Sequence, residues 1–245
     1  MEIRNGLASI LVRQVGGCIE HWSTAPNFDI FFPYFEFGNG IERGGSFVCF
    51  PCYGKNPDGF PRNGFVKESD FLVYEPFVDG DGIEMNLLSK EIRPPYNLDI
   101  HRHIVVYERS LKEIIKIYGN DQSKDLLYRP GFRSFLKILH PEEDIHVEVL
   151  DSSGRIVRQA INVFKIKERP MEKKIADLSD IDKISLSIRG IGEVVIITII
   201  GDLPCTNLYV STDNIQYLCV NIVFGRYSRK INRESFTFGV EYEID

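Results

Sequence analysis

Short runs of β-branched and aromatic residues recur along the whole chain. Examples are "SFVCF", "HIVVYE", "IHVEVL", "VVIITII" and "YLCVNIVF". Such runs are typical of strands. The segments between many of them, among them "GNG", "DGDG", "YGND" and "DSSG", have turn chemistry. We therefore expect about fourteen short strands in sequence, bounded by tight turns.

The last of these runs alternates clearly. Phe236, Phe238, Val240, Tyr242 and Ile244 fall on one face of a strand, and two glutamates fall on the other. No window sustains a helical period over three turns. The charged stretch "KERPMEKKIADLSDIDK" is interpreted as a connection or insertion near residues 165–180. Strands without alternating helices predict an all-β chain, a large antiparallel β-sandwich forming a single domain over residues 1–245.

Composition narrows the class of partner. Hydrophobic residues make up 43% of the 245 residues, which is enough for a sizeable core, and the net charge is −6. An acidic chain lacks the basic face that nucleic acid or an anionic membrane requires. The longest apolar stretch, residues 194–200, is too short to cross a bilayer. We therefore expect neither nucleic acid nor a membrane as the main partner.

The five cysteines favour a reducing compartment. They are odd in number, and the first residues have no basic segment followed by a long apolar run. We therefore expect free thiols and a cytoplasmic location. Cys49 and Cys52 form a Cys-x-x-Cys, but no helix follows it, and Cys205 and Cys219 lack the spacing of a second zinc-binding pair. No metal or cofactor is expected.

Five segments together resemble the aldose 1-epimerase (galactose mutarotase) family, and the hexose-6-phosphate mutarotase branch is closest in pattern. They are "IERGGSFVCFPCYG" (41–54), "PRNGFVKES" (61–69), "PGFRSFLKI" (130–138), "SDIDKISL" (179–186) and "QYLCVNIVFG" (216–225). Their order and rough spacing agree along nearly the whole chain. The resemblance implies a galactose mutarotase-like sandwich with a sugar site on its concave face.

The resemblance also implies a reaction, which is exchange between the two anomers of a sugar. The exchange needs an acid and a base on opposite sides of the anomeric carbon, roles that histidines and a glutamate fill in the family. Here Asn63 and Arg133 stand in the two histidine positions, and Asn221 stands in the glutamate position. An amide does not titrate usefully and arginine stays protonated. The sequence thus predicts that proton transfer is weak or lost.

Some binding chemistry is retained by the same resemblance. Arg43 and Lys67 match cations that clamp a phosphate in the hexose-phosphate branch, Arg133 adds a third cation, and Asp182 matches an aspartate that contacts sugar hydroxyls. Each has a plainer interpretation. Lys67 and Asp182 lie in charged, solvated surroundings, Arg43 precedes a bend, and an inward Arg133 would need a partner.

The two asparagines also have plainer interpretations. Asn63 precedes Gly64, a pair that favours a tight turn with positive φ. Asn221 lies between apolar residues, where its amide could be satisfied by backbone. With the resemblance, both become candidates for lining a sugar pocket.

The leading hypothesis is a mutarotase-like protein that binds a hexose or hexose phosphate as its small-molecule partner. One alternative is an active aldose 1-epimerase with His101 or His103 as acid and Asp182 or Glu68 as base. Another is a structural or partner-binding sandwich without a sugar site. The two histidines have a spacing that can bind metal, but no third ligand is nominated. The sequence does not settle the oligomeric state.

Overall fold

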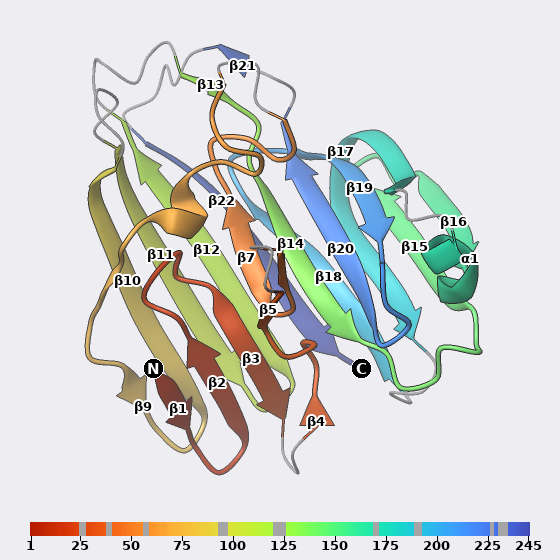
Figure 1. Cartoon of the computed structure of the whole chain (residues 1–245), viewed down its shortest axis with the longest axis horizontal. Coiled ribbons are helices and arrows are strands. Elements are labelled where there is room, and N and C mark those ends of the chain that lie inside the picture. The colour runs from red at the N-terminus through yellow and green to blue at the C-terminus, as the bar shows by residue number, and fades with distance from the viewer. Residues whose placement is uncertain are drawn as a thin grey trace.

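The computed structural model describes residues 1–24, 28–37, 41–55, 59–92, 98–119, 126–168, 172–188, 193–225, 228–229 and 235–245. Two β-sheets pack face to face, and the pairings between their strands are antiparallel (Figure 1). The predicted all-β antiparallel sandwich is therefore confirmed. Among the described residues, no helix has the length and apolar character needed to span a membrane.

The front sheet faces the viewer in Figure 1. Its strands are β1 (Glu2–Arg4), β2 (Ala8–Val12), β3 (Ile19–Thr24), β4 (Phe28–Asp29), β7 (Ser46–Cys49), β14 (Gly131–Lys137), β20 (Tyr217–Phe224) and β19 (Cys205–Ser211). From β7 the order runs through β14 and β20 to β19. Segments far apart in sequence are thus neighbours at the centre of this sheet.

The back sheet begins at an edge made by β8 (Leu72–Val73) and β9 (Phe77–Val78), both of which pair with β10. Its other strands are β10 (Gly82–Ile92), β11 (Leu98–Tyr107), β12 (Ser110–Tyr118), β22 (Ser235–Ile244), β18 (Glu193–Gly201), β17 (Lys173–Ile188), β15 (Ile145–Asp151) and β16 (Ile156–Ile161), in this spatial order. The alternation expected for 236–244 is confirmed, because its apolar residues are buried.

β17 joins the two sheets. Its first part pairs with β19 of the front sheet, and its second part pairs with β18 and β15 of the back sheet. The prediction of a charged connection over 167–183 is therefore wrong for most of that range. Ile175, Ala176, Ile181 and Ile184 are buried along the strand. Shifts of register around 175 and 178–180 break the period of two, which hides the strand from pattern analysis.

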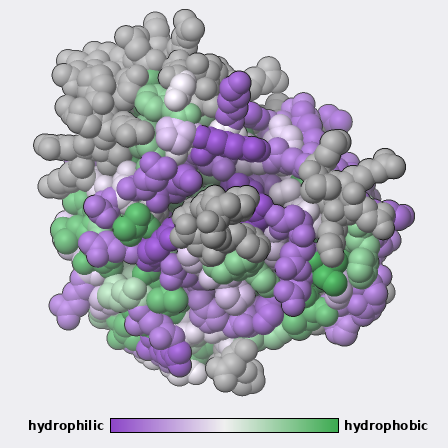
Figure 2. All heavy atoms as spheres, viewed as in Figure 1, coloured by the Kyte–Doolittle hydropathy of each residue, from purple (hydrophilic) through white to green (hydrophobic). Residues whose placement is uncertain are grey.

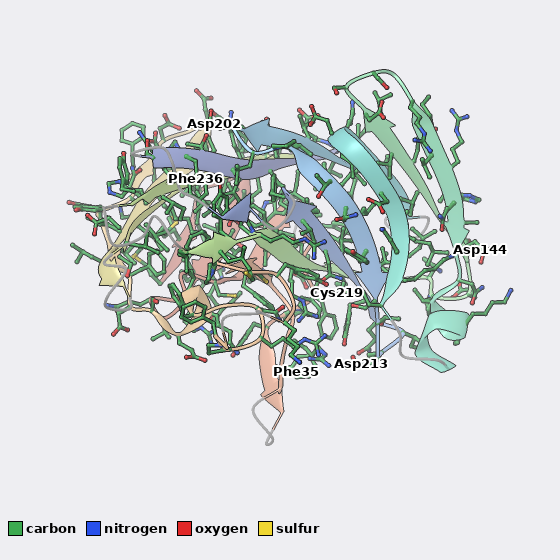
Figure 3. All side chains as sticks on the ribbon, turned by 90° about the horizontal axis from the view of Figure 1, so that it is seen from above. Phe35, Asp144, Asp202, Asp213, Cys219 and Phe236 are labelled. Carbon is green, nitrogen blue, oxygen red and sulfur yellow. The ribbon has the colours of Figure 1, made fainter. Side chains whose placement is uncertain are left out.

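The remaining elements are short. The hairpin β5 (Phe35–Phe37) and β6 (Ile41–Arg43) and the ribbon of β13 (Leu127–Tyr128) with β21 (Ser228–Arg229) are separate two-stranded sheets. A 3₁₀ turn, η1, covers Val66–Glu68, and one short helix, α1, covers Val163–Glu168. In Figure 3 the β5–β6 hairpin stands out from the front sheet, on the side where Asp213 and Cys219 lie.

The central strands of the front sheet are buried on both faces. Phe132 of β14 and Val220 of β20 join the main core between the sheets, whereas Phe135 and Cys219 join a second cluster on the outer face. All eight residues of β20 are buried. A strand covered on both faces reads as a continuous apolar run, and any polar side chain on its outer face is therefore held in apolar surroundings.

A charged pair lies inside the main core. Arg102 of β11 and Glu113 of β12 are 1% and 0% exposed, and Arg102 Nη2 lies 2.8 Å from Glu113 Oε1. Arg102 Nη1 also donates to the carbonyl of Gly17. Side chains alternate between the two faces of each strand, and Arg102 and Glu113 fall on the buried face. The loss of solvation at such a site offsets most of the Coulomb attraction.

Candidate functional site

A pocket of about 200 Å³ lies on the outer face of the front sheet, where the loop after β7 approaches β14 and β20. It is lined by Arg43, Tyr53, Arg62, Asn63, Arg133, Phe135, Glu172, Ser211, Thr212, Asp213, Tyr217 and Cys219. Figure 2 shows hydrophilic side chains across the middle of this face. The lining combines charged and hydroxyl groups with aromatic rings, which is the chemistry of a small-ligand site.

Arg133 and Asn221 meet at the floor of the pocket. They are direct cross-strand partners in β14 and β20, and Arg133 Nε donates to Asn221 Oδ1 at 3.0 Å. Asn221 is 0% exposed. Its amide nitrogen lies 3.4 Å from both Ser211 Oγ and the Cys219 carbonyl oxygen. The amide is thus held by its neighbours and orients Arg133.

Aromatic rings and thiols surround the Arg133 guanidinium. Its central carbon lies 5.5 Å from the Phe47 ring and 5.6 Å from the Phe135 ring, within the range of cation–π contact. Its Nη2 lies 3.7 Å from Cys219 Sγ. Burial raises the pKa of the Cys219 thiol, and burial raises the pKa of Cys49 to about 12, although Arg133 opposes both shifts. Both sulfurs are therefore neutral thiols near neutral pH.

Arg43 is held at the wall of the pocket by groups distant in sequence. Its Nε donates to Asp213 Oδ2 at 2.8 Å and lies 3.1 Å from Tyr217 Oη. Asp213 belongs to the turn between β19 and β20, so this ion pair ties the end of β6 to the front sheet. Because Asp213 neutralises the charge of Arg43, this arginine attracts an anionic ligand only weakly.

Asn63 occupies a tight turn and also lines the pocket. Its φ is +67°, in the left-handed region that asparagine tolerates. Its backbone N–H donates to the Gly54 carbonyl, and its Oδ1 accepts from the Gly54 N–H, each at 2.9 Å. Gly64 follows with φ +80°, and a Cβ there would lie 1.9 Å from the Phe50 carbonyl oxygen. The loop thus depends on the local chemistry of "NG".

The structure gathers four of the six predicted site residues. Arg43, Asn63 and Arg133 line one pocket, and Asn221 lies directly beneath Arg133. Lys67, in η1, is not among the residues that line it. The backbone of Asp182 lies in β17, but its side chain is outside the described residues.

Sequence reasoning missed several lining residues. Arg62 stands beside Asn63 in the same segment, and this adjacency could have identified it. Asp213 is 170 residues from Arg43, and nothing local in the sequence connects them. Glu172 also lines the pocket, and loss of solvent around its carboxyl raises its pKa, although the side chain as a whole is exposed.

The two histidines considered as substitute acids lie elsewhere. His101 and His103 alternate with buried residues along β11, on the solvent face of the back sheet. His103 Nε2 lies 3.0 Å from Glu84 Oε1, and the His101 ring lies 4.7 Å from the Tyr118 ring. The prediction that either acts at the Arg43–Asn63 cleft is therefore wrong. Within the described part of the chain, no three His, Cys, Asp or Glu residues are placed to share a metal ion.

Comparisons with known proteins agree with this architecture. No protein-family model matches the sequence, and no curated protein sequence matches it significantly. The Slr1438 protein from Synechocystis sp. PCC 6803 is similar in structure, with a TM-score of 0.76 at 14% identity, over 100% of this chain and 95% of that chain.

Two further solved structures are similar over the whole chain. A galactose mutarotase-like protein from Lactobacillus casei ATCC 334 has a TM-score of 0.73 at 14% identity, covering 100% of this chain and 99% of that chain. A galactose mutarotase related enzyme from Lactobacillus acidophilus has a TM-score of 0.67 at 12% identity, covering 100% and 97%. At such identities the likeness concerns the backbone alone. The chain has the galactose mutarotase-like fold.

Proposed function

We propose that this protein binds a hexose or hexose phosphate in the Arg43–Asn63–Arg133 pocket, with little or no acceleration of anomer exchange. The observation that carries the proposal is the Arg133–Asn221 pair, because these two residues bond to each other at the pocket floor and neither can exchange a proton near neutral pH. The likeness of fold to mutarotase-like proteins supports a sugar as the ligand class.

The lining suits a small polyhydroxyl ligand. Ser211 brings a hydroxyl group to the lining, and the largely buried Tyr53 and Tyr217 add aromatic atoms to its wall. The volume of about 200 Å³ is below the ~300–1,000 Å³ of typical drug-sized sites. A single sugar unit fits this description better than an oligosaccharide.

The missing chemistry is a positioned acid and base. Each such group typically contributes ~10²–10⁴-fold to a rate. Of the two lining carboxylates in the described part of the chain, Asp213 is bound to Arg43. Glu172, whose raised pKa suits a base, favours the second candidate function, which is an active epimerase. One carboxylate alone does not supply both partners, so we rank binding first.

The third candidate, a sandwich without any sugar site, calls for a blocked cleft. The described residues instead leave a pocket of about 200 Å³, which counts against this function without naming a ligand. Calorimetric titration with glucose, galactose and glucose 6-phosphate would separate binding from its absence. Arg43→Gln breaks the Asp213 contact at the pocket wall, and Arg4→Gln removes a matched exposed ion pair with Glu2 far from it.

We expect at least one of the three sugars to bind. Binding should weaken about tenfold in Arg43→Gln, because losing the charge-assisted bond to Asp213 loosens the pocket wall. Arg4→Gln should bind like the wild type. Absence of heat with every sugar, confirmed by an unchanged melting temperature, would contradict the proposal. Equal weakening by the two variants would mean that the effect is not local to the pocket.

A further inference from the structure

The charges of the pocket are not balanced at its floor. Arg43 is paired with Asp213. The described partners of Arg133 are the Asn221 amide oxygen and the Cys219 sulfur, both neutral. Among the described residues, no carboxylate lies within ion-pair distance of Arg133. The described carboxylate that attracts this cation is Asp213, which acts from beyond ion-pair distance and is already bound to Arg43. Arg133 therefore has no carboxylate of its own in the described part of the protein.

This imbalance is unfavourable unless something compensates for it. The Arg133 side chain is partly shielded between Phe47 and Phe135, and both of these residues belong to the apolar outer cluster. Partly buried charges are normally paired. The chain is acidic, with a net charge of −6, so the cation is not part of a generally basic surface. The neighbouring thiols offer no negative charge either, because burial raises their pKa.

The donors of Arg133 are arranged to receive one more acceptor. Nε is used by Asn221, and Nη2 contacts Cys219. Nη1 has no hydrogen-bond partner in the described part of the chain, and it is not among the side-chain atoms sealed off from solvent there. Since Arg133 lines the pocket, the free end of the guanidinium can donate two parallel N–H bonds to an oxyanion.

We propose that the pocket floor is an oxyanion subsite centred on Arg133, so that the ligand carries a carboxylate or phosphate that enters the pocket first. This inference rests on the proposed sugar-binding function and narrows its ligand to acidic sugars. It places recognition of the charge on Arg133 rather than on Arg43, which Asp213 neutralises, or on Lys67, which does not line the pocket.

Glu172 is the carboxylate of the lining that could oppose this. It forms no ion pair or hydrogen bond with the three lining arginines, and the rise in its pKa comes from loss of solvent. It is exposed as a residue, whereas Arg133 reaches the pocket from a central strand. The ligand's anion is therefore expected next to Arg133, away from Glu172.

The test compares matched ligands by calorimetry at fixed ionic strength and neutral pH. The probes are glucose, glucuronate, glucose 6-phosphate and inorganic phosphate. In the wild type, the two acidic sugars should bind about 10- to 100-fold more tightly than glucose, the range expected for charge-assisted bonds. Glucuronate and glucose 6-phosphate distinguish a carboxylate from a phosphate as the preferred anion.

Three variants locate the charge. Arg133→Gln should abolish the preference for acidic sugars, and Arg133→Lys should keep part of it, because lysine retains charge without the fork. Arg4→Gln removes the same charge from an exposed residue outside the pocket and should leave the preference unchanged. If Arg133→Gln does not fold, comparing Arg133→Lys with Arg4→Gln still decides the question.

The outcomes separate this inference from the proposed function. If the wild type binds glucose as tightly as the acidic sugars, the oxyanion subsite is refuted and sugar binding stands. If inorganic phosphate binds as tightly as glucose 6-phosphate and depends on Arg133, the subsite stands and the sugar assignment fails. If Arg4→Gln lowers the preference as much as Arg133→Gln, the preference does not depend on the charge at the pocket floor and the inference is overturned.

Discussion

Arg133 and Asn221 face each other directly across β14 and β20, and the Arg133 Nε donates to the Asn221 Oδ1 at 3.0 Å. The resemblance to aldose 1-epimerases places an imidazole and a carboxylate at these two positions. Here a permanent cation and a neutral amide stand in contact instead. The pair carries one positive charge, and neither residue has a proton to exchange near neutral pH.

The first prediction converts this pair into an ion pair. Asn221→Asp would give Arg133 an internal counter-charge, so the affinity for acidic sugars should fall about 10- to 100-fold while glucose binding stays nearly unchanged. Calorimetric titration measures both. Asn86→Asp, on an exposed position of β10, adds the same charge far from the pocket and should leave both affinities as they are. An unchanged acidic-sugar affinity in Asn221→Asp would contradict the charge argument.

The second prediction concerns the turn at Asn63. Asn63→Ala loses the hydrogen bond to the Gly54 N–H and places alanine at φ +67°, so it should destabilise the protein by about 1–2 kcal/mol. Asn63→Gly loses the same bond but suits this φ, and it should cost less. Denaturant unfolding gives both values. If the two variants are equally stable, backbone conformation at this turn is not what selects asparagine.

The third prediction concerns the buried Arg102–Glu113 pair. Glu113→Ala leaves Arg102 as an uncompensated charge in the core and should cost about 3–5 kcal/mol. Replacing both residues together, as Arg102→Met with Glu113→Leu, should be close to neutral, since neither charge is then buried. Denaturant unfolding of the single and double variants tests this. A double variant as unstable as Glu113→Ala would show that the pair itself stabilises the fold.

The fourth prediction is a pH dependence at Asp151. The Ser153 hydroxyl, and the N–H groups of Arg155 and Ser153, donate to this carboxylate and lower its pKa against the opposing effect of burial. A lowered pKa in the folded state stabilises the protein above the unfolded-state pKa of about 3.9, and this stability is lost as the pH falls through the folded-state pKa.

Wild type and Asp151→Asn should therefore differ in unfolding free energy by a constant amount above about pH 5, and this difference should narrow as the pH falls below about 4 and through the folded-state pKa. Urea unfolding across this range measures the difference. Asn86→Gln, which exchanges one amide for another at an exposed position of β10, should not change the slope of the acid limb there. If the difference in unfolding free energy between wild type and Asp151→Asn does not change with pH, the charge of the carboxylate does not stabilise this turn.

Much of the fold was predictable from local pattern. The period of two at 236–244 and the continuous apolar run at 217–224 correspond to β22 and β20, which are covered on one and on both faces of a sheet. β17 was not predicted, because charged residues and register shifts interrupt the alternation of apolar and polar positions along it. Its strand character comes from pairing with β18, which follows it directly, and with β15 and β19, which are further away in the chain. No short window contains all of these partners.

The candidate site was predictable only in part, for the same reason. The order of the motifs identified four site residues, each in a different segment: Arg43, Asn63, Arg133 and Asn221. The contact between Arg43 and Asp213 depends on a turn 170 residues away, so the loss of Arg43 as a free cation could not be foreseen. The orientation of His101 toward solvent follows from which face of β11 meets the core, which a single strand does not reveal.

The central claim is that the protein binds a sugar without catalysing proton transfer. NMR exchange between the α and β anomers tests this claim most directly. The samples are glucose, galactose and glucose 6-phosphate with concentrated wild-type protein at neutral pH, beside Asn63→His, which restores one imidazole. We predict saturable line broadening of at least one sugar with no faster anomer exchange in either protein, because Arg133 and Asn221 remain in both. Clear acceleration by the wild type would contradict the account.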